Sequence, residues 1–379
     1  MSDRDLCTAP LPLEPMRVRR TYQGGSGLDR WHGAANPRES NRPEEWLASM
    51  TAAVNPGFPL VENEGLSAAV IGGTRVLLRD LVEQTPEGML GRAHTAKYGA
   101  QPGVLAKIID SAERLTIQVH PDKAFARDYF HSEYGKTECW HILSTRTIDG
   151  QPPCLLMGFR PGVTRAVWED AYRRQDIPAM LNCLHRLTPR PGDTWLIRGG
   201  LPHAIGPGCT LVEIQEPTDY TLRSERTQMD GTPIPDALIH QGLGDEALME
   251  CFHYDGMKLA DLEASCRLTP ETVDFTGGNR WQLLVGPHDT SCFAMERLEV
   301  HAPMHLSGQG RFSILTVLEG SGTLSWKEGE IPAAQGQQFF LPAGMERLTL
   351  NGALTAVRCH PPGAAPLPPT VSQESKWRH

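Results

Sequence analysis

Four side chains with metal-binding chemistry occur in three short segments of this 379-residue chain. Gln118 and His120 alternate with apolar residues in LTIQVH, Glu138 lies in GKTECW, and His203 follows a Gly-Gly-Leu-Pro turn. Because side chains of a strand alternate between its faces, Gln118 and His120 project to one side. Two neutral imidazoles, a carboxylate and an amide oxygen form a mixed nitrogen and oxygen donor set. The sequence therefore predicts one divalent metal ion per chain at these residues; Zn²⁺ fits, and Fe²⁺, Mn²⁺, Co²⁺ or Ni²⁺ is chemically suitable.

Other charged residues lie close to the predicted metal ligands in sequence. Lys136 shares a strand face with Glu138, so a cation and a carboxylate come together. Glu213 lies in the strand-like TLVEIQ, and Arg223 follows ten residues later. Glu213 and Arg223 could form an ordinary surface ion pair, which would contribute little. Their proximity to the predicted metal favours a functional role, since proton transfer on an anionic substrate needs an acid or base and cations.

Three further histidines are expected to be structural. His141 falls on the strand face opposite Glu138, and the surroundings of His131 and His185 offer no matching ligands. We therefore leave all three outside the predicted metal site.

Strands are expected to position most of these residues. VLAKIIDSAERLTIQVHPD, from residue 104, has the pattern of a strand, a turn and a second strand. Strands are also predicted in 191–219 and from 279 to about 360, two short helices in 164–187, and mainly helix and loop in 233–270. The first hundred residues look like short strands and long loops, interrupted by a short helix or packing loop at 42–49 (RPEEWLAS).

An internal repeat divides the chain. The spacing G-x5-R-x-G-x2-H at 192–203 is matched by G-x5-P-x-G-x2-R at 336–347, and the segment after Glu138 aligns with the segment after Ser313. Two related β-barrels are the economical interpretation. Ser313 and Arg347 then replace Glu138 and His203, so only the first barrel should bind the metal.

This interpretation gives a mainly β chain of two jelly-roll-like β-barrels with inserted helical segments. The expected units are an N-terminal strand and loop region packed on the first barrel (1–100), the catalytic barrel (101–226) with a helical insertion near 164–187, a helical and loop insertion (227–279), the degenerate second barrel (280–362) and a proline-rich flexible tail (363–379).

Composition limits the class of protein. With 40% hydrophobic and 21% charged residues, the chain can bury a substantial core, and its formal net charge of −9 disfavours binding to nucleic acid or a membrane surface.

We expect no signal peptide or membrane span, and therefore a soluble cytoplasmic protein, monomeric or homodimeric. The nine cysteines contain no C-x-x-C pair and are expected to be mostly buried thiols.

The motifs LTIQVHPD, YGKTECW, LPHAIGPG and LVEIQEPTD-x3-R together resemble those of type I mannose-6-phosphate isomerases, which are bicupin zinc enzymes. The resemblance also covers RTYQGGSGLDRWHG and RPEEWLAS, and it extends more weakly into the second barrel. It implies that the zinc ligands are Gln118, His120, Glu138 and His203. It also implies that the active-site lysine, acid and arginine are Lys136, Glu213 and Arg223, and that Thr116 supplies a hydroxyl near the phosphate.

The resemblance further implies reversible conversion of mannose 6-phosphate to fructose 6-phosphate through an enediol, with Lys136 and Arg223 contacting substrate. The chain departs from the family pattern at Arg198–Leu201 and at Ile205, where substrate preference could differ. Three alternatives stay open: an isomerase of another sugar phosphate, an iron cupin oxygenase that uses two histidines and a carboxylate, and a non-catalytic sugar-binding cupin.

Overall fold

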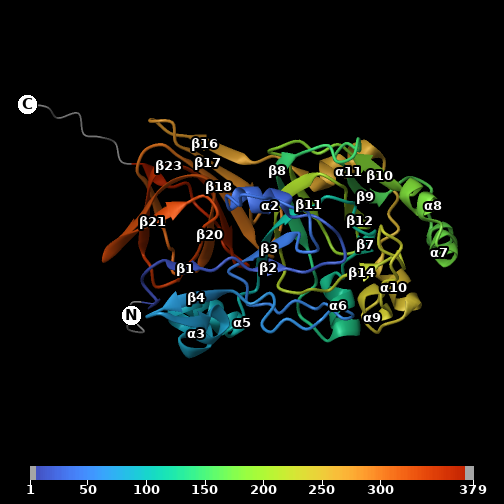
Figure 1. The fold of residues 1–379 in the computed structure, drawn as a ribbon, viewed down its shortest axis with the longest axis horizontal. Helices are drawn as coiled ribbons and strands as arrows, with labels where there is room; N and C mark the ends of the chain where they lie inside the picture. Colours follow the sequence, from blue (N-terminus) through green and yellow to red (C-terminus); the bar gives the residue numbers. More distant parts are fainter. Residues whose placement is uncertain (1–5, 372–379) are drawn as a thin grey trace, which may run out of the picture.

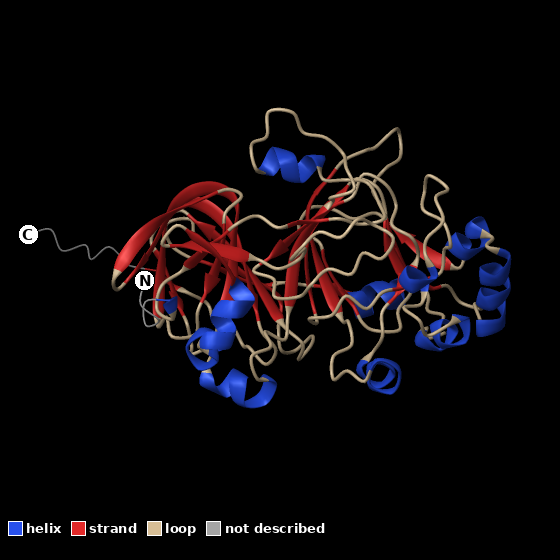
Figure 2. Cartoon of the chain, turned by 60° about the horizontal axis from the view of Figure 1, so that its bottom comes forward, coloured by secondary structure: helices blue, strands red, loops and turns tan. Residues whose placement is uncertain are grey.

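Antiparallel strands form most of the molecule, which is described here from a computed structural model over residues 6–371. Figure 1 shows the C-terminal strands at one end and several helices at the other, and Figure 2 shows helices mostly around the periphery of the strands. The expectation of a mainly β chain is confirmed. Over the described residues the sheets are open rather than closed barrels.

A seven-stranded and a five-stranded sheet build the first half of the molecule. The seven-stranded sheet contains, in order, β15 (Arg267–Leu268), β11 (Thr194–Ile197), β8 (Glu138–Thr145), β13 (Cys209–Gln215), β6 (Leu105–Asp110), β3 (Glu44–Leu47) and β2 (Arg17–Val18). The five-stranded sheet contains β10 (Leu184–Leu187), β9 (Leu155–Phe159), β12 (His203–Ile205), β7 (Gln118–Val119) and β14 (Leu222–Arg223). One apolar cluster takes Trp140 and Trp195 from the first sheet and Met157 and Ile205 from the second. The two sheets therefore pack face to face, as layers of a sandwich do.

A ten-stranded sheet builds the second half. Its main path is β1 (Leu11–Leu13), β22 (Gln338–Leu341), β20 (Ser313–Trp326), β23 (Arg347–His360), β18 (Ala294–Val300), β17 (Arg280–Val285) and β16 (Glu271–Asp274). Three more strands pair beside this path: β19 (Met304–Ser307), β21 (Gly329–Ala334) and β24 (Thr370–Val371). Part of the predicted tail is thus a strand against β19, while residues 372–379 of that tail lie outside the described residues.

The N-terminal segment connects the two halves. Strand β1 pairs with β22 of the ten-stranded sheet, whereas β2 and β3 extend the seven-stranded sheet. The hairpin of β4 (Ala68–Ile71) and β5 (Thr74–Leu77) turns through Gly72 and Gly73, both with positive φ, which is the requirement of a tight two-residue turn. The N-terminal residues therefore contact both halves rather than the first alone.

Helices cover the sheets in two groups. The predicted helices of 164–187 and 233–270 are confirmed; most of them share one apolar cluster with β9 and β12, and the last, at 259–266, packs in the cluster between the two facing sheets. These helices are α7 (Arg165–Arg174), α8 (Ile177–Asn182), α9 (Asp236–Ile239), α10 (Asp245–Cys251) and α11 (Leu259–Cys266), with α6 (Lys123–Phe130) nearby. The second group is α2 (Ser26–Trp31), α3 (Leu78–Gln84), α4 (Pro86–Leu90) and α5 (Arg92–Tyr98).

Two expectations for the first hundred residues were wrong. The segment 42–49 contains a strand, β3, because pairing with β6 and β2 outweighs the local preference of its charged residues. Helices α3 to α5 fill a region expected to be loop, and they bury Leu78, Leu81, Met89 and Leu90 in the core shared by the two halves.

Two other expectations concern cysteines and membranes. Eight of the nine cysteines are buried, Cys7 is partly exposed, and all are free thiols, as predicted. Among the described residues, no helix is long and apolar enough to span a bilayer.

Candidate active site

Three of the predicted metal ligands meet between the two facing sheets. The ligand atoms of His120, Glu138 and His203 all lie within 4.8 Å of one another. Nε2 of His120 is 3.1 Å from one Glu138 oxygen, and Nε2 of His203 is 3.4 Å from the other. Glu138 begins β8 of the seven-stranded sheet, whereas His203 begins β12 of the five-stranded sheet. The site therefore forms only where the two layers of the sandwich approach.

Gln118 adjoins this cluster through strand pairing. It is the partner of His203 in the β7–β12 ladder, and its side-chain amide is 3.3 Å from Nε2 of His203. The amide oxygen and nitrogen are nearly isosteric, so a rotation of the amide would present its oxygen to the cluster instead. Gln118 is thus close enough to be the fourth donor.

The protonation of the cluster suits a metal. Burial lowers the pKa of both His120 and His203, so the imidazoles are neutral at physiological pH. Nδ1 of His203 contacts the backbone oxygen of Leu201 at 2.8 Å and donates its proton there, which leaves a lone pair on Nε2. Neither oxygen of the buried Glu138 carboxylate receives a hydrogen bond of normal geometry. A buried carboxylate whose oxygens lack hydrogen bonds is costly, and a divalent cation would coordinate these oxygens, so the residues present fit a metal ion.

Lys136 extends the cluster on one side. Its Nζ is 3.0 Å from Nε2 of His120, 3.5 Å from Glu138 and 3.3 Å from Oγ1 of Thr221. The side chain is 4% exposed. Burial lowers the pKa of Lys136, although the neighbouring Glu138 opposes this shift.

A small cavity of about 40 Å³ brings the other predicted residues together. Five residues singled out from the sequence line it: Thr116, Gln118, Lys136, Glu213 and Arg223. Ile205, at one of the two departures from the family pattern, lines it as well. The guanidinium of Arg198, at the other departure, bonds to the backbone of Ser265.

Glu213 is buried, so the possibility of a surface ion pair with Arg223 was wrong. One of its oxygens is 2.9 Å from Nζ of Lys107, and the other accepts a hydrogen bond of 2.8 Å from the indole of Trp140. Burial, together with the nearby charge of Glu138, raises the pKa of Glu213, and Lys107 opposes this rise. Glu213 is thus a carboxylate held in place by two donors.

Arg223 is partly exposed at the edge of the cavity. Its guanidinium donates to the backbone oxygens of Thr221 and Leu238. Burial lowers the pKa of Arg223 to about 10, so it remains a cation at neutral pH. No carboxylate among the described residues forms an ion pair with it.

Comparison with known proteins gives one consistent family. Residues 287–361 match the model of the mannose-6-phosphate isomerase cupin domain. GmuF of Bacillus subtilis, a probable mannose-6-phosphate isomerase, is 25% identical over 93% of this chain and 100% of its own length. ManA of the same organism, a mannose-6-phosphate isomerase, is 24% identical over 68% of this chain and 74% of its own. The chain is therefore similar to mannose-6-phosphate isomerases over most of its length, and its residues 287–361 match their cupin domain.

Solved structures of this isomerase family share the fold. The mannose 6-phosphate isomerase from Bacillus subtilis superposes with a TM-score of 0.72 at 22% identity, over 93% of this chain and 100% of that one. A zinc-bound mannose 6-phosphate isomerase superposes with a TM-score of 0.69 at 17% identity, over the same shares. The chain therefore shares the mainly β fold of these isomerases.

Several polar and charged residues at the cavity were not singled out from the sequence. They are Arg20, Tyr22, Glu44, Lys107 and Asp219. Glu44 accepts hydrogen bonds from Arg20, Tyr22 and Trp46, and Asp219 accepts two from Arg20. Burial opposes ionisation of Glu44, but Arg20 and Lys107 outweigh it and hold the pKa of Glu44 below its ordinary value.

One signal in the sequence could have found part of this network. Lys107 stands within the apolar run VLAKII, and a charge buried in a strand needs a partner. Arg20, Tyr22 and Asp219 lie in loops far from Lys107 in sequence, so their convergence has no local signature.

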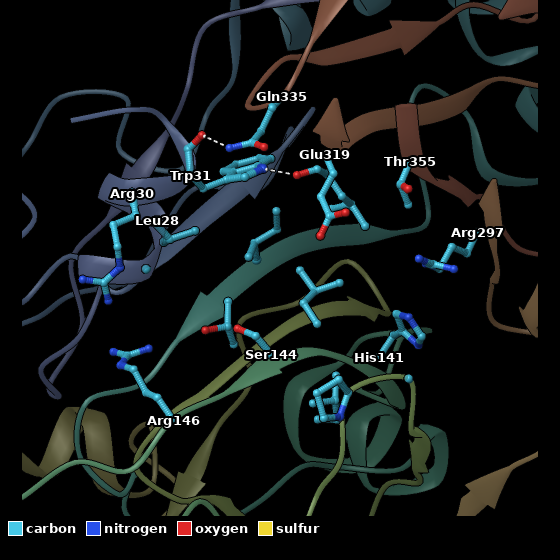
Figure 3. Close-up of a pocket in the computed structure, with 18 of the residues that line it drawn as sticks. Leu28, Arg30, Trp31, His141, Ser144, Arg146, Arg297, Glu319, Gln335 and Thr355 are labelled. Atoms are coloured by element: carbon cyan, nitrogen blue, oxygen red, sulfur yellow. Dashed lines mark hydrogen bonds between the residues drawn. The ribbon is translucent and has the colours of Figure 1, made fainter. Parts of the chain in front are cut away.

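The three histidines expected to be structural lie outside the cluster. Nδ1 of His141 contacts the hydroxyl of Thr194, and the ring faces a different cleft of about 660 Å³ between α2, β8 and the ten-stranded sheet (Figure 3). Nε2 of His185 contacts the backbone oxygen of Met257 at 2.8 Å. His131 caps the end of α6 with a positive φ.

Proposed function

We propose that this chain is a metal-dependent aldose–ketose isomerase that interconverts mannose 6-phosphate and fructose 6-phosphate through an enediol. The observation that carries the proposal is the buried cluster of His120, Glu138 and His203 beside the cavity lined by Lys136 and Arg223. The family relatives named mannose-6-phosphate isomerase support the same substrate. The proposed partner is a small sugar phosphate, and the proposed setting is the cytoplasm, as monomer or homodimer.

We also propose that the two halves are a pair of jelly-roll-like barrels derived from one repeat, a catalytic unit at 101–226 and a degenerate unit at 280–362. Strand pairing supports the alignment. Glu138 pairs with Ile197 in the first half, and Ser313 pairs with Leu341 in the second, at the offset that the repeated glycine motif predicts.

One Zn²⁺ per chain is the proposed metal, held by Gln118, His120, Glu138 and His203. A bound zinc ion would act as a Lewis acid that stabilises negative charge developing on the sugar oxygens. The zinc-bound relative supports zinc over the other divalent ions.

Residues of the chain would bind and orient the substrate. Lys136 donates a hydrogen bond to a sugar oxygen, while Arg223 and the Thr116 hydroxyl contact the phosphate. The cavity of about 40 Å³ has room for a few water molecules but not for a hexose phosphate, which can enter only when lining side chains move. Arg223 is bonded only to backbone oxygens and is partly exposed, so we propose that it turns toward the phosphate on binding.

Glu213 is the proposed carrier of the proton between C2 and C1. Its raised pKa suits a group that alternately takes and gives a proton near neutral pH. Lys136, whose pKa is lowered by burial, is the alternative candidate for this proton transfer. Glu213→Gln should lower kcat by about 10²-fold or more and abolish solvent hydrogen exchange at the substrate carbon. Exchange at the wild-type rate in Glu213→Gln would assign the proton to Lys136, and Lys136→Met would then lose it.

A single assay tests the function. The EDTA-treated protein is given mannose 6-phosphate, and formation of fructose 6-phosphate is measured before and after addition of each divalent metal. We expect no turnover without metal and restored turnover with Zn²⁺. Folded protein that stays inactive with every metal would contradict the assignment. Turnover of other sugar phosphates, oxygen uptake with Fe²⁺, or sugar binding without turnover would then identify the alternative.

A further inference from the structure

Another cavity, with three arginines in a largely apolar lining, lies in the ten-stranded sheet, in the C-terminal half of the chain. It has a volume of about 410 Å³ and is enclosed by strand β19, the loop 308–311, the beginning and end of β23, and the segment 364–370. In Figure 1 this sheet lies at the end of the molecule opposite α7 and α8, so the cavity is separate from the proposed active site.

Three arginines line this cavity, and two of them have no partner. Within residues 6–371, the guanidinium groups of Arg311 and Arg347 form no hydrogen bond or ion pair. Arg358 is buried and already matched: it donates to Ser313 at 2.8 Å, to Glu296 at 3.3 Å and to the backbone of Ser307 at 3.2 Å. Among the described residues, the only carboxylate in the lining is the exposed Glu346. Residues 6–371 therefore leave positive charge in the cavity without a compensating carboxylate, in a chain whose net charge is −9.

The repeat places this cavity at the counterpart of the metal cluster. Ser313 and Arg347 occupy the positions that Glu138 and His203 hold in the first half. Where the first half has a carboxylate between two imidazoles, the second has the Arg358 guanidinium bonded to Ser313. The sign of the charge is inverted, and a site that suits a cation becomes one that suits an anion.

The cleft of Figure 3 has less of this excess charge. Of its three arginines, Arg146 is paired with Asp110 and Glu39, and Arg297 is paired with Glu299. An anion at Arg146 or Arg297 would have to displace a carboxylate. An anion at Arg311 and Arg347 would displace only water.

We propose that Arg311, Arg347 and Arg358 form a binding site for the phosphate group of a small phosphorylated molecule, independent of the metal centre. Guanidinium groups match phosphate oxygens in bidentate geometry. A phosphate monoester carries about −1.5 to −2 charges at pH 7, enough to balance the two unpaired arginines. The cavity has room for a sugar-sized group beyond the phosphate.

Calorimetric titration of the full metal-loaded chain with inorganic phosphate at low salt tests the site. We expect binding that the double variant Arg311→Gln/Arg347→Gln weakens at least tenfold. Arg223→Gln should retain this binding, which distinguishes it from phosphate at the proposed active site. Arg297→Gln, an arginine paired with Glu299, is the matched control and should bind within twofold of wild type.

Because the guanidiniums of Arg311 and Arg347 have no described partners, the double variant should melt within a few degrees of wild type in the absence of phosphate. Acetate should bind at least tenfold more weakly than phosphate. The proposal is overturned if phosphate binding is absent, if the double variant binds as wild type does, or if acetate binds equally well. None of these outcomes depends on isomerase activity, so failure of the phosphate site leaves the proposed function unaffected, and failure of the isomerase assay leaves the phosphate site unaffected.

Discussion

The two halves of the molecule have matching strand registers but opposite chemistry at the matched positions. Glu138 and Ser313 both begin a central strand, and each pairs with the last residue of the neighbouring strand, Ile197 or Leu341. Around Glu138 the neighbours are two imidazoles, whereas around Ser313 the neighbour is a buried guanidinium. The backbone framework thus supplies a location, and the charge of a few side chains decides which ligand it suits.

The halves also differ in how they balance buried charge. Lys107 lies between two carboxylates, 2.9 Å from Glu213 and 3.7 Å from Glu44. In the second half, Glu296 is a single carboxylate shared by Arg358, His360 and the indole of Trp281. In the first arrangement one lysine is shared by two carboxylates, each of which has other donors, whereas in the second several donors share one acceptor.

Glu138→Gln should have the largest effect on function. It removes the only charged ligand of the cluster, so we expect metal content to fall below one tenth of wild type and kcat/KM to fall about 10³-fold or more, the scale of lost electrostatic stabilisation. Metal analysis and the isomerase assay measure both. Ser313→Ala changes the matched position of the second half and should keep metal and activity within twofold. Equal losses in the two variants would contradict a single active half.

Lys107→Met should strongly destabilise the fold. It leaves Glu213 with Trp140 as its remaining donor, and breaking a buried ion pair costs about 3–5 kcal/mol. Arg358→Met is the counterpart; His360 and Trp281 still serve Glu296, so we expect a loss of about 2 kcal/mol. Urea unfolding of both variants gives the comparison. A larger loss for Arg358→Met would reverse the contrast between the halves.

His141 should make stability depend on pH. Burial lowers the pKa of His141 to about 4, from an ordinary value of 6.5. Between these values the unfolded chain binds a proton that the folded chain does not, so stability is lost as pH falls from 6.5 to 4, by about 3 kcal/mol at most. His141→Gln should remove this part of the pH dependence of unfolding. His301→Gln, at an exposed position of the second half, should leave it unchanged; identical pH profiles for wild type and His141→Gln would refute the prediction.

Arg198→Ala should have the smallest effect. The Arg198 side chain is exposed and bonds to the backbone of Ser265 rather than lining the small cavity. We expect kcat/KM for mannose 6-phosphate within about threefold of wild type, because lost exposed contacts usually change free energies by under about 0.5 kcal/mol. Ile205→Ala alters a buried residue that lines the cavity and should raise KM more. A larger rise in KM for Arg198→Ala than for Ile205→Ala would instead place Arg198 at the substrate site.

Local sequence was enough to locate much of the active half. The alternation of LTIQVH predicted that Gln118 and His120 share a face, and both lie beside His203 and Glu138. The helices of 164–187 and 233–270 were also evident, because caps and apolar spacing are local properties. By contrast, 42–49 was assigned wrongly, since its strand exists only through pairing with β6 and β2.

By itself the sequence determined the strand periodicity and the donor types of the predicted metal cluster, and it carries the repeated spacing on which the proposed relation of the two halves rests. Only the tertiary structure decided that Glu213 pairs with Lys107 rather than Arg223, and that Arg20, Glu44 and Asp219 join the cavity. It also decided that Arg358 meets Ser313. Side-chain alternation acts between neighbours in the chain, whereas buried charges are paired across strands and loops up to about 200 residues apart.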